Sequence, residues 1–380
     1  MEKESPEKLL TSWLGERLRE KLIGLGQVDS ACFAYPFSQD KEDPSPLASY
    51  LYQKNLLDNL FFGSTPSFRQ EIVDYFYTDD KKIQGISSNF ARSRTNRYRY
   101  SSGDLLGQET IPTPKYPKLP KMCSVQSSAA LICNLLARPR KTGEAFMSVQ
   151  MKPGIFPAGQ YKTYLEYPLR TLKNSNGAPT HPAMADALLY CGDTLIVVES
   201  KLKEYLSGEH EVLSSPAYLD RKCYWLSGEP EAQAPQRFID LFKQVNAQIA
   251  NFEIGFDGLQ LLRHALGICN ELSMGNPDFK GIKHIYLMNS VWSVPLDSPL
   301  WRGQDKWKAL YQPLWEKEAD PKHRDVLGET LTGILTDCYP GITFQFLFLT
   351  AKEFADCLDL EDVKNEKGLG LGEYLQRYWL

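Results

Sequence analysis

The pattern of apolar and polar positions gives the chain a helical beginning. Apolar residues recur near helical spacing from Leu9 to Leu22, which predicts an amphipathic helix. Two more helices are expected over 46–62 and 67–77, with glycine and proline between them. We therefore expect residues 1–80 to be mainly helical.

The rest of the chain combines helices with strands. A capped helix is predicted in SVQSSAALICNLLAR, and two strands follow in ADALLYC (185–191) and TLIVVESK (194–201). Gly192-Asp193 between them is a signal for a two-residue hairpin turn. Further elements are expected as amphipathic helices over 237–250 and 256–272, apolar strands over 284–290 and 342–350, and a strand or short helix over 161–169.

This order of elements predicts an α/β fold, with a mixed central sheet flanked by helices and a helical N-terminal extension. The length of 380 residues favours two domains, or one large domain with an extension. We place the N-terminal region at 1–120, ending in the proline-rich linker IPTPKYPKLP, and the α/β domain at 121–380, with a long acidic insertion over 206–236.

Composition excludes several classes of protein. Hydrophobic residues make up 42% and the net charge is −4, so the chain is neither disordered nor basic throughout. No apolar run reaches the roughly 18 residues of a membrane span, and the charged N-terminus lacks an apolar signal region. The eight cysteines form no C-x2-C pair, which argues against a zinc ribbon. We expect a cytoplasmic protein without membrane contacts.

Positive charge is concentrated in residues 81–143, which hold twelve lysines and arginines against two acidic residues. Within this segment, RSRTNRYRY alternates arginine with tyrosine, a combination that suits a polyanion with stackable bases. The alternative is a solvated loop whose ion-pair partners lie in the acidic remainder. On the first interpretation, nucleic acid is bound by Arg92, Arg94, Arg97 and Arg99.

The two predicted strands bring together the residues with the clearest chemistry. If Gly192 and Asp193 form the turn, counting back along the hairpin places Asp186 opposite Glu199. Facing residues of an antiparallel pair point to the same side, with Cβ atoms about 5 Å apart. Because side chains alternate along a strand, Lys201 shares that side with Glu199.

Opposed carboxylates destabilise a sheet unless a cation lies between them. Mg²⁺ prefers carboxylate oxygens and retains waters, so we predict a Mg²⁺ site at Asp186, Glu199 and Ser200, with Mn²⁺ as a substitute. Lys201 would position or help to deprotonate the attacking water and offset developing negative charge. The alternative is a strand that leaves the core, with merely solvated last residues.

Asp186 followed by Glu199-Ser200-Lys201 resembles the motif of the PD-(D/E)XK nucleases, which have the restriction-endonuclease-like fold. The usual proline is replaced by Ala185. The chain is also similar to a family of bacterial restriction-endonuclease-like proteins over roughly residues 120–290. The matching segments are SSAALICNLL with Ser127, Ser128 and Asn134, LEYPL with Glu166, ESKLKEYL with Glu204, and LQLLRHALG with Gln260, Arg263 and His264.

Three residues are further candidates for the site. Gln260 and Arg263 lie at helical spacing and could meet a phosphate near the metal, although a helix that merely joins surface to core would look the same. Glu166 could be a further metal ligand or one half of a cross-strand ion pair. The five histidines lack the spacing of a zinc site, and no P-loop motif is present.

We therefore expect a Mg²⁺-dependent endonuclease that hydrolyses DNA without a covalent intermediate. The resemblance implies a role in defence against foreign DNA. One alternative is a nuclease that acts on RNA or single strands, and another is a catalytically idle nuclease fold that binds nucleic acid or serves in an assembly. Because cutting both strands often needs two active sites, a homodimer or a partner subunit is expected.

Overall fold

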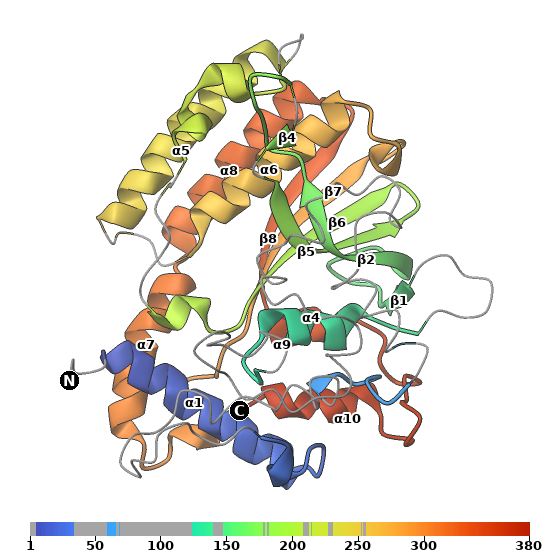
Figure 1. The fold of residues 1–380 in the computed structure, drawn as a ribbon, viewed down its shortest axis with the longest axis vertical. Helices are drawn as coiled ribbons and strands as arrows, with labels where there is room; N and C mark the ends of the chain where they lie inside the picture. Colours follow the sequence, from blue (N-terminus) through green and yellow to red (C-terminus); the bar gives the residue numbers. More distant parts are fainter. Residues whose placement is uncertain are drawn as a thin grey trace.

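The structure is a computed structural model in which a twisted sheet lies between two groups of helices (Figure 1). The residues it describes are 5–33, 59–65, 68, 124–139, 147–177, 179–180, 182–207, 213, 215–226, 231–251, 253 and 256–380. No helix in these ranges is long and apolar enough to cross a membrane.

A mixed sheet of six strands, described over these ranges, runs through the centre of the fold. Its order is β1 (Met147–Met151), β2 (Gly159–Leu169), β5 (Ala183–Cys191), β6 (Thr194–Lys201), β7 (His284–Val291) and β8 (Thr343–Thr350). The pairs from β1 to β6 are antiparallel, whereas β6, β7 and β8 are parallel. Strands β3 (Leu172–Lys173) and β4 (Pro179–Thr180) form a separate ribbon. The predicted α/β class, with a mixed sheet flanked by helices, is confirmed.

Helices cover both faces of the sheet, and each face has its own hydrophobic core (Figure 1). Strand β6 supplies residues to both cores, because successive side chains of a strand point to opposite faces of the sheet. Leu195 enters one core and Ile196 the other. One core is covered by α5 (Ala234–Ala250), α6 (Gly258–Ser273) and α8 (Pro321–Cys338). The other is covered by α1 (Pro6–Gly24), α4 (Ser128–Leu136), α7 (Asp305–Glu318), α9 (Ala351–Asp356) and α10 (Leu371–Leu375).

The first predicted helix is confirmed as α1. Ser5 caps it by accepting a hydrogen bond from the N–H of Lys8, and its leucines at helical spacing are buried. Trp13 stacks on Trp301 and Trp307, with ring centroids 5.8 and 5.4 Å apart. Helix α1 therefore shares one hydrophobic core with the sheet and the C-terminal helices.

Most of the predicted elements in the second half are present. Gly192 has φ +59° in the predicted two-residue turn, and Cys191 pairs with Thr194 across it. The segment that the pattern left open, 161–169, is part of strand β2. Strand β1 and helices α7 and α8 were not predicted, and α7 contains an internal proline that interrupts its pattern.

The other N-terminal predictions meet the described residues only at their edges. The expected helix over 46–62 is described only at 59–62, where residue 59 lies in a 3-10 helical turn and the chain bends and turns over 60–62. Asn59 donates a hydrogen bond of 2.9 Å to the carbonyl of Ser124. The helix expected over 67–77 lies outside the described residues apart from residue 68.

Gly267 lets α6 approach β2 closely. A Cβ at this position would lie 2.5 Å from the Cβ of Leu169. We expect Gly267→Ala to lower the free energy of unfolding by about 1–3 kcal/mol, because the helix must move off the sheet. Urea denaturation measures this change.

The matched control is Gly333→Ala on α8. There the nearest heavy atom to a new Cβ is a guanidinium nitrogen of Arg237, 3.9 Å away. This substitution should raise the free energy of unfolding by about 0.5–1 kcal/mol through helix propensity. Similar effects of the two substitutions would contradict the close approach.

Candidate active site

Strands β5 and β6 separate at the predicted site. Their main-chain pairing runs from Cys191–Thr194 to Ala187–Val198 and stops before the Asp186–Glu199 position. There the N–H of Ser200 donates to Oδ2 of Asp186 at 2.6 Å. The predicted register is correct from Cys191–Thr194 to Ala187–Val198. The expected main-chain pairing of Asp186 with Glu199 is absent, and a hydrogen bond from the N–H of Ser200 to the carboxylate of Asp186 stands in its place.

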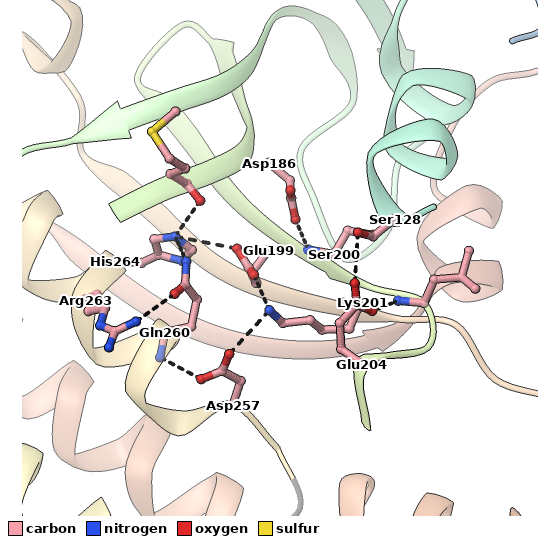
Figure 2. A network of polar contacts seen from close by, with 12 residues as sticks. Ser128, Asp186, Glu199, Ser200, Lys201, Glu204, Asp257, Gln260, Arg263 and His264 are labelled. Atoms are coloured by element: carbon pink, nitrogen blue, oxygen red, sulfur yellow. Dashed lines mark hydrogen bonds and ion pairs between the residues drawn. The ribbon is translucent and has the colours of Figure 1, made fainter. Parts of the chain in front are cut away.

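Glu199 and Lys201 form a buried ion pair at the end of β6 (Figure 2). The Nζ of Lys201 lies 2.6 Å from Oε1 of Glu199 and 3.4 Å from Oδ2 of Asp257. The side chain of Glu199 is only 7% exposed. Its second oxygen, Oε2, is buried and has no hydrogen-bond partner in the described part of the chain.

Electrostatics couple Asp186 to this pair. Burial raises the pKa of Asp186 well above its ordinary value, and the nearby carboxylates of Glu199 and Glu166 raise it further. Lys201 and the N–H of Ser200 oppose this shift but do not cancel it. The negative charge around Asp186 is therefore only partly compensated.

Glu166 lies on β2 opposite Asp186, because Leu165 and Tyr167 on either side pair with the residues that flank Asp186. Its φ of +50° is unusual for a residue with a side chain. Leu165 and Tyr167 enter opposite cores, so the strand changes face at this point. Backbone strain of about 1–3 kcal/mol thus accompanies a buried carboxylate beside Asp186.

Helix α6 brings a row of polar side chains to Glu199 (Figure 2). The Nε2 of His264 lies 3.6 Å from Oε2 of Glu199, 3.2 Å from the carbonyl of Met184 and 3.3 Å from Nε2 of Gln260. Burial lowers the pKa of His264, so the imidazole is neutral at pH 7. The Oε1 of Gln260 accepts a hydrogen bond from Nη1 of Arg263 at 3.5 Å. Gln260 is therefore placed between Arg263 and His264, and its link to Glu199 runs through His264.

The turn after β6 is tied to α4. Glu204 accepts hydrogen bonds from the N–H groups of Leu202 and Lys203, at 2.7 and 2.9 Å, and from the hydroxyl of Ser128 at 3.2 Å. Ser127 caps α4 by accepting from the N–H of Ala130. These contacts fix the chain direction just beyond Lys201.

Asn134, which the resemblance also singled out, contacts the N-terminal region instead. Its amide nitrogen donates to the carbonyl of Asn59 and to the hydroxyl of Tyr378, and its oxygen accepts from the N–H of Phe61. Because all these groups are buried, Asn134 joins segments that are distant in sequence.

Two acidic residues near Lys201 were missed from the sequence. Asp257 caps α6 by accepting from the N–H of Gln260 at 3.0 Å, and its other oxygen faces Lys201. The cap could have been recognised, because an aspartate precedes the start of an amphipathic pattern. Glu318, the last residue of α7, had no such signal.

Glu318 is a buried carboxyl group. It is 2% exposed, and its Oε2 has no hydrogen-bond partner among the residues described. Burial raises its pKa to about 8, although the charges of Lys201 and Arg324 act in the opposite direction. At neutral pH it is mostly protonated.

The remaining site predictions are not tested by this geometry. Arg92, Arg94, Arg97 and Arg99 lie outside the described residues. Within the described ranges, no group of three or more histidine, cysteine, aspartate or glutamate residues is arranged to hold a metal ion. Comparisons with protein-family models, curated proteins and solved structures found no match.

The protonated state of Glu318 predicts a pH dependence of stability. Its pKa is raised in the folded protein from about 4.5 to about 8, so its contribution to stability is present below pH 4.5 and is lost as the pH rises toward 8. Glu318→Gln keeps the neutral shape. Its free energy of unfolding relative to wild type should increase by about 3 kcal/mol between pH 5 and pH 7.5.

Urea denaturation in EDTA at several pH values measures this difference. Glu316→Gln, an exposed position on the same helix, is the control and should show no such slope. A constant difference between Glu318→Gln and wild type across this range would refute the buried, protonated state.

Proposed function

We propose that this chain is a Mg²⁺-dependent endonuclease that hydrolyses DNA phosphodiester bonds on a restriction-endonuclease-like core. The main support is the geometry at the end of β6. There Lys201 lies 2.6 Å from Glu199, and Asp186 binds the next N–H, where the two strands separate. A structural role gives no reason to place two carboxylates side by side when one of them, Glu199, is buried with an oxygen that accepts no hydrogen bond.

The residues present fit Mg²⁺. This ion is commonly bound by one or two carboxylates and keeps several waters, so it needs no cage of three or more acidic side chains. Asp186 and the buried Oε2 of Glu199 supply two hard oxygens. Ser200 would add its main-chain carbonyl, because the N–H and C=O of one strand residue point to the same edge and Asp186 binds that N–H. Bound there, Mg²⁺ would supply Lewis-acid chemistry to a phosphate oxygen.

Lys201 serves as a charged hydrogen-bond donor. Burial lowers its pKa, but Glu199 and Asp257 more than offset this effect, so the pKa lies well above the ordinary value for lysine. The ammonium group therefore retains its proton in the metal-free protein. Of the three predicted roles, two fit this state: positioning the attacking water and offsetting negative charge on the phosphate. A protonated ammonium group is unsuited to deprotonating the water.

His264 and Asp257 orient these groups. His264 contacts both the carbonyl of Met184 on β5 and Glu199 on β6, so it joins the two strands beyond the end of their ladder. Asp257 holds Lys201 from the side opposite Glu199. By resemblance, the proposal extends to action in the cytoplasm against foreign DNA and to a second copy or a partner subunit that cuts the other strand.

The first test removes each proposed group. Asp186→Asn, Glu199→Gln and Lys201→Ala should each reduce cleavage by about 100-fold or more, because a metal ligand or a charge next to the phosphate is lost. Plasmid, linear duplex and RNA are incubated with the purified protein in Mg²⁺ or EDTA. Cleavage of RNA alone would favour the alternative substrate.

Thermal melts must accompany this assay. Mg²⁺ should raise the Tm of wild type more than that of either carboxylate variant. Metal-free Asp186→Asn should be at least as stable as wild type, because one of two neighbouring carboxylates is removed. Metal-free Glu199→Gln should be less stable, because the ammonium group of Lys201 loses its partner at 2.6 Å. Asp193→Asn, at the far end of the hairpin, is the control. Folded variants with the wild-type rate would rule out this catalytic centre, and a wild type that binds DNA without cutting it would favour the idle fold.

The second test concerns the arginine-tyrosine segment. Phosphate contacts release counterions, so DNA affinity should fall steeply as salt rises. Charge reversal at Arg94, Arg97 and Arg99 together should weaken binding and flatten the slope of log Kd against log salt concentration. Fluorescence anisotropy with a labelled duplex measures both. An unchanged slope would assign these arginines to ion pairs within the protein.

A further inference from the structure

Helix α7 presents one face to the end of β6. Tyr311, Trp315 and Glu318 lie four and three residues apart, which places them on the same side of the helix. The hydroxyl of Tyr311 is 3.2 Å from that of Tyr205, and the ring of Trp315 packs on Tyr205 at 5.9 Å between centroids. Tyr205 follows Lys201 by four residues, in the short helix Glu204–Ser207. This face therefore carries Glu318 toward Lys201.

Several charged groups surround Glu318. They are Lys201 on β6, Asp257 at the start of α6, Arg324 on α8 and Glu204 after β6. Arg324 is already engaged, because it donates to the carbonyl of Ala319 at 3.1 Å and lies over Phe348 at 4.1 Å. Lys201 is the remaining cation of this group, and its present contacts are Glu199 and Asp257.

Lys201 would lose part of its compensating negative charge if Glu199 binds a cation. Oε1 of Glu199, which now accepts from Lys201, would then share its charge with the ion. A buried ammonium group that loses its partner is costly. The buried Oε2 of Glu318 has no hydrogen bond in the described structure, and Glu318 lies near enough for the charge of Lys201 to lower its pKa.

We propose that Glu318 is a positioning residue of this site, protonated while Lys201 is paired with Glu199 and ionised, as a partner of Lys201 alongside Asp257, once a divalent cation occupies Glu199. This inference rests on the proposed function. The proton of the Glu318 carboxyl leaves to the solvent, and no other bond changes. Glu318 thereby holds the ammonium group in place while the charge on Glu199 is drawn to the ion.

The test is calorimetric titration of the full-length protein with Mg²⁺ alone at pH 7. Titrations in two buffers of different ionisation enthalpy give the number of protons released per bound ion. Glu318→Gln should release about one proton fewer than wild type, and it should bind Mg²⁺ several-fold more weakly. Glu318→Asp, which can still ionise, should keep the proton release.

Glu316→Gln is the matched control on the exposed side of α7, and it should release as many protons as wild type. Equal release by Glu318→Gln and wild type would overturn the inference while leaving the proposed function intact. Wild type that binds no Mg²⁺ would overturn both. A Glu318→Gln protein that fails to fold would also count against the inference, because removal of a buried ionisable group should stabilise the protein.

Discussion

Repulsion between neighbouring carboxyl groups is the constraint on which the arrangement of this site depends. Asp186, Glu199 and Glu166 lie side by side on three neighbouring strands, and their mutual charge helps to raise the pKa of Asp186. Burial of like charges is unfavourable unless protons, hydrogen bonds or cations compensate for it. The N–H of Ser200 and the ammonium group of Lys201 supply part of that compensation. A divalent cation would supply the rest.

The groups that position Glu199 and Lys201 come from both faces of the sheet. Helix α6, on one face, contributes Asp257 and His264, and the close approach at Gly267 fixes its distance from β2. Helices α4 and α7, on the other face, hold the chain after Lys201 through Glu204 and Tyr205. The site therefore lies where two hydrophobic cores meet at the end of β6. Neither core alone could enclose it.

The strongest predictions came from local rules of turn geometry and strand alternation. The glycine in the turn and the alternation of apolar residues specify the register of the β5–β6 hairpin. That register placed Asp186 next to Glu199, and the structure places them at adjacent ends of the two strands. The register could not reveal that the carboxylate of Asp186 accepts the hydrogen bond from Ser200 where the main-chain ladder ends. Which partner a side chain binds depends on how far the two strands separate, and the sequence does not give that distance.

The sequence by itself determined the α/β class, helix α1, the hairpin and the convergence of Asp186, Glu199 and Lys201, because each follows from spacing within a few residues or across one tight turn. Only the tertiary structure decided that Glu166 faces Asp186 through a change of strand face, that Asp257 approaches Lys201, and that Glu318 lies where the charge of Lys201 affects its pKa. These contacts join residues separated by 20 to more than 100 positions in the sequence. Such contacts depend on how helices pack across the sheet, and no local periodicity encodes that packing.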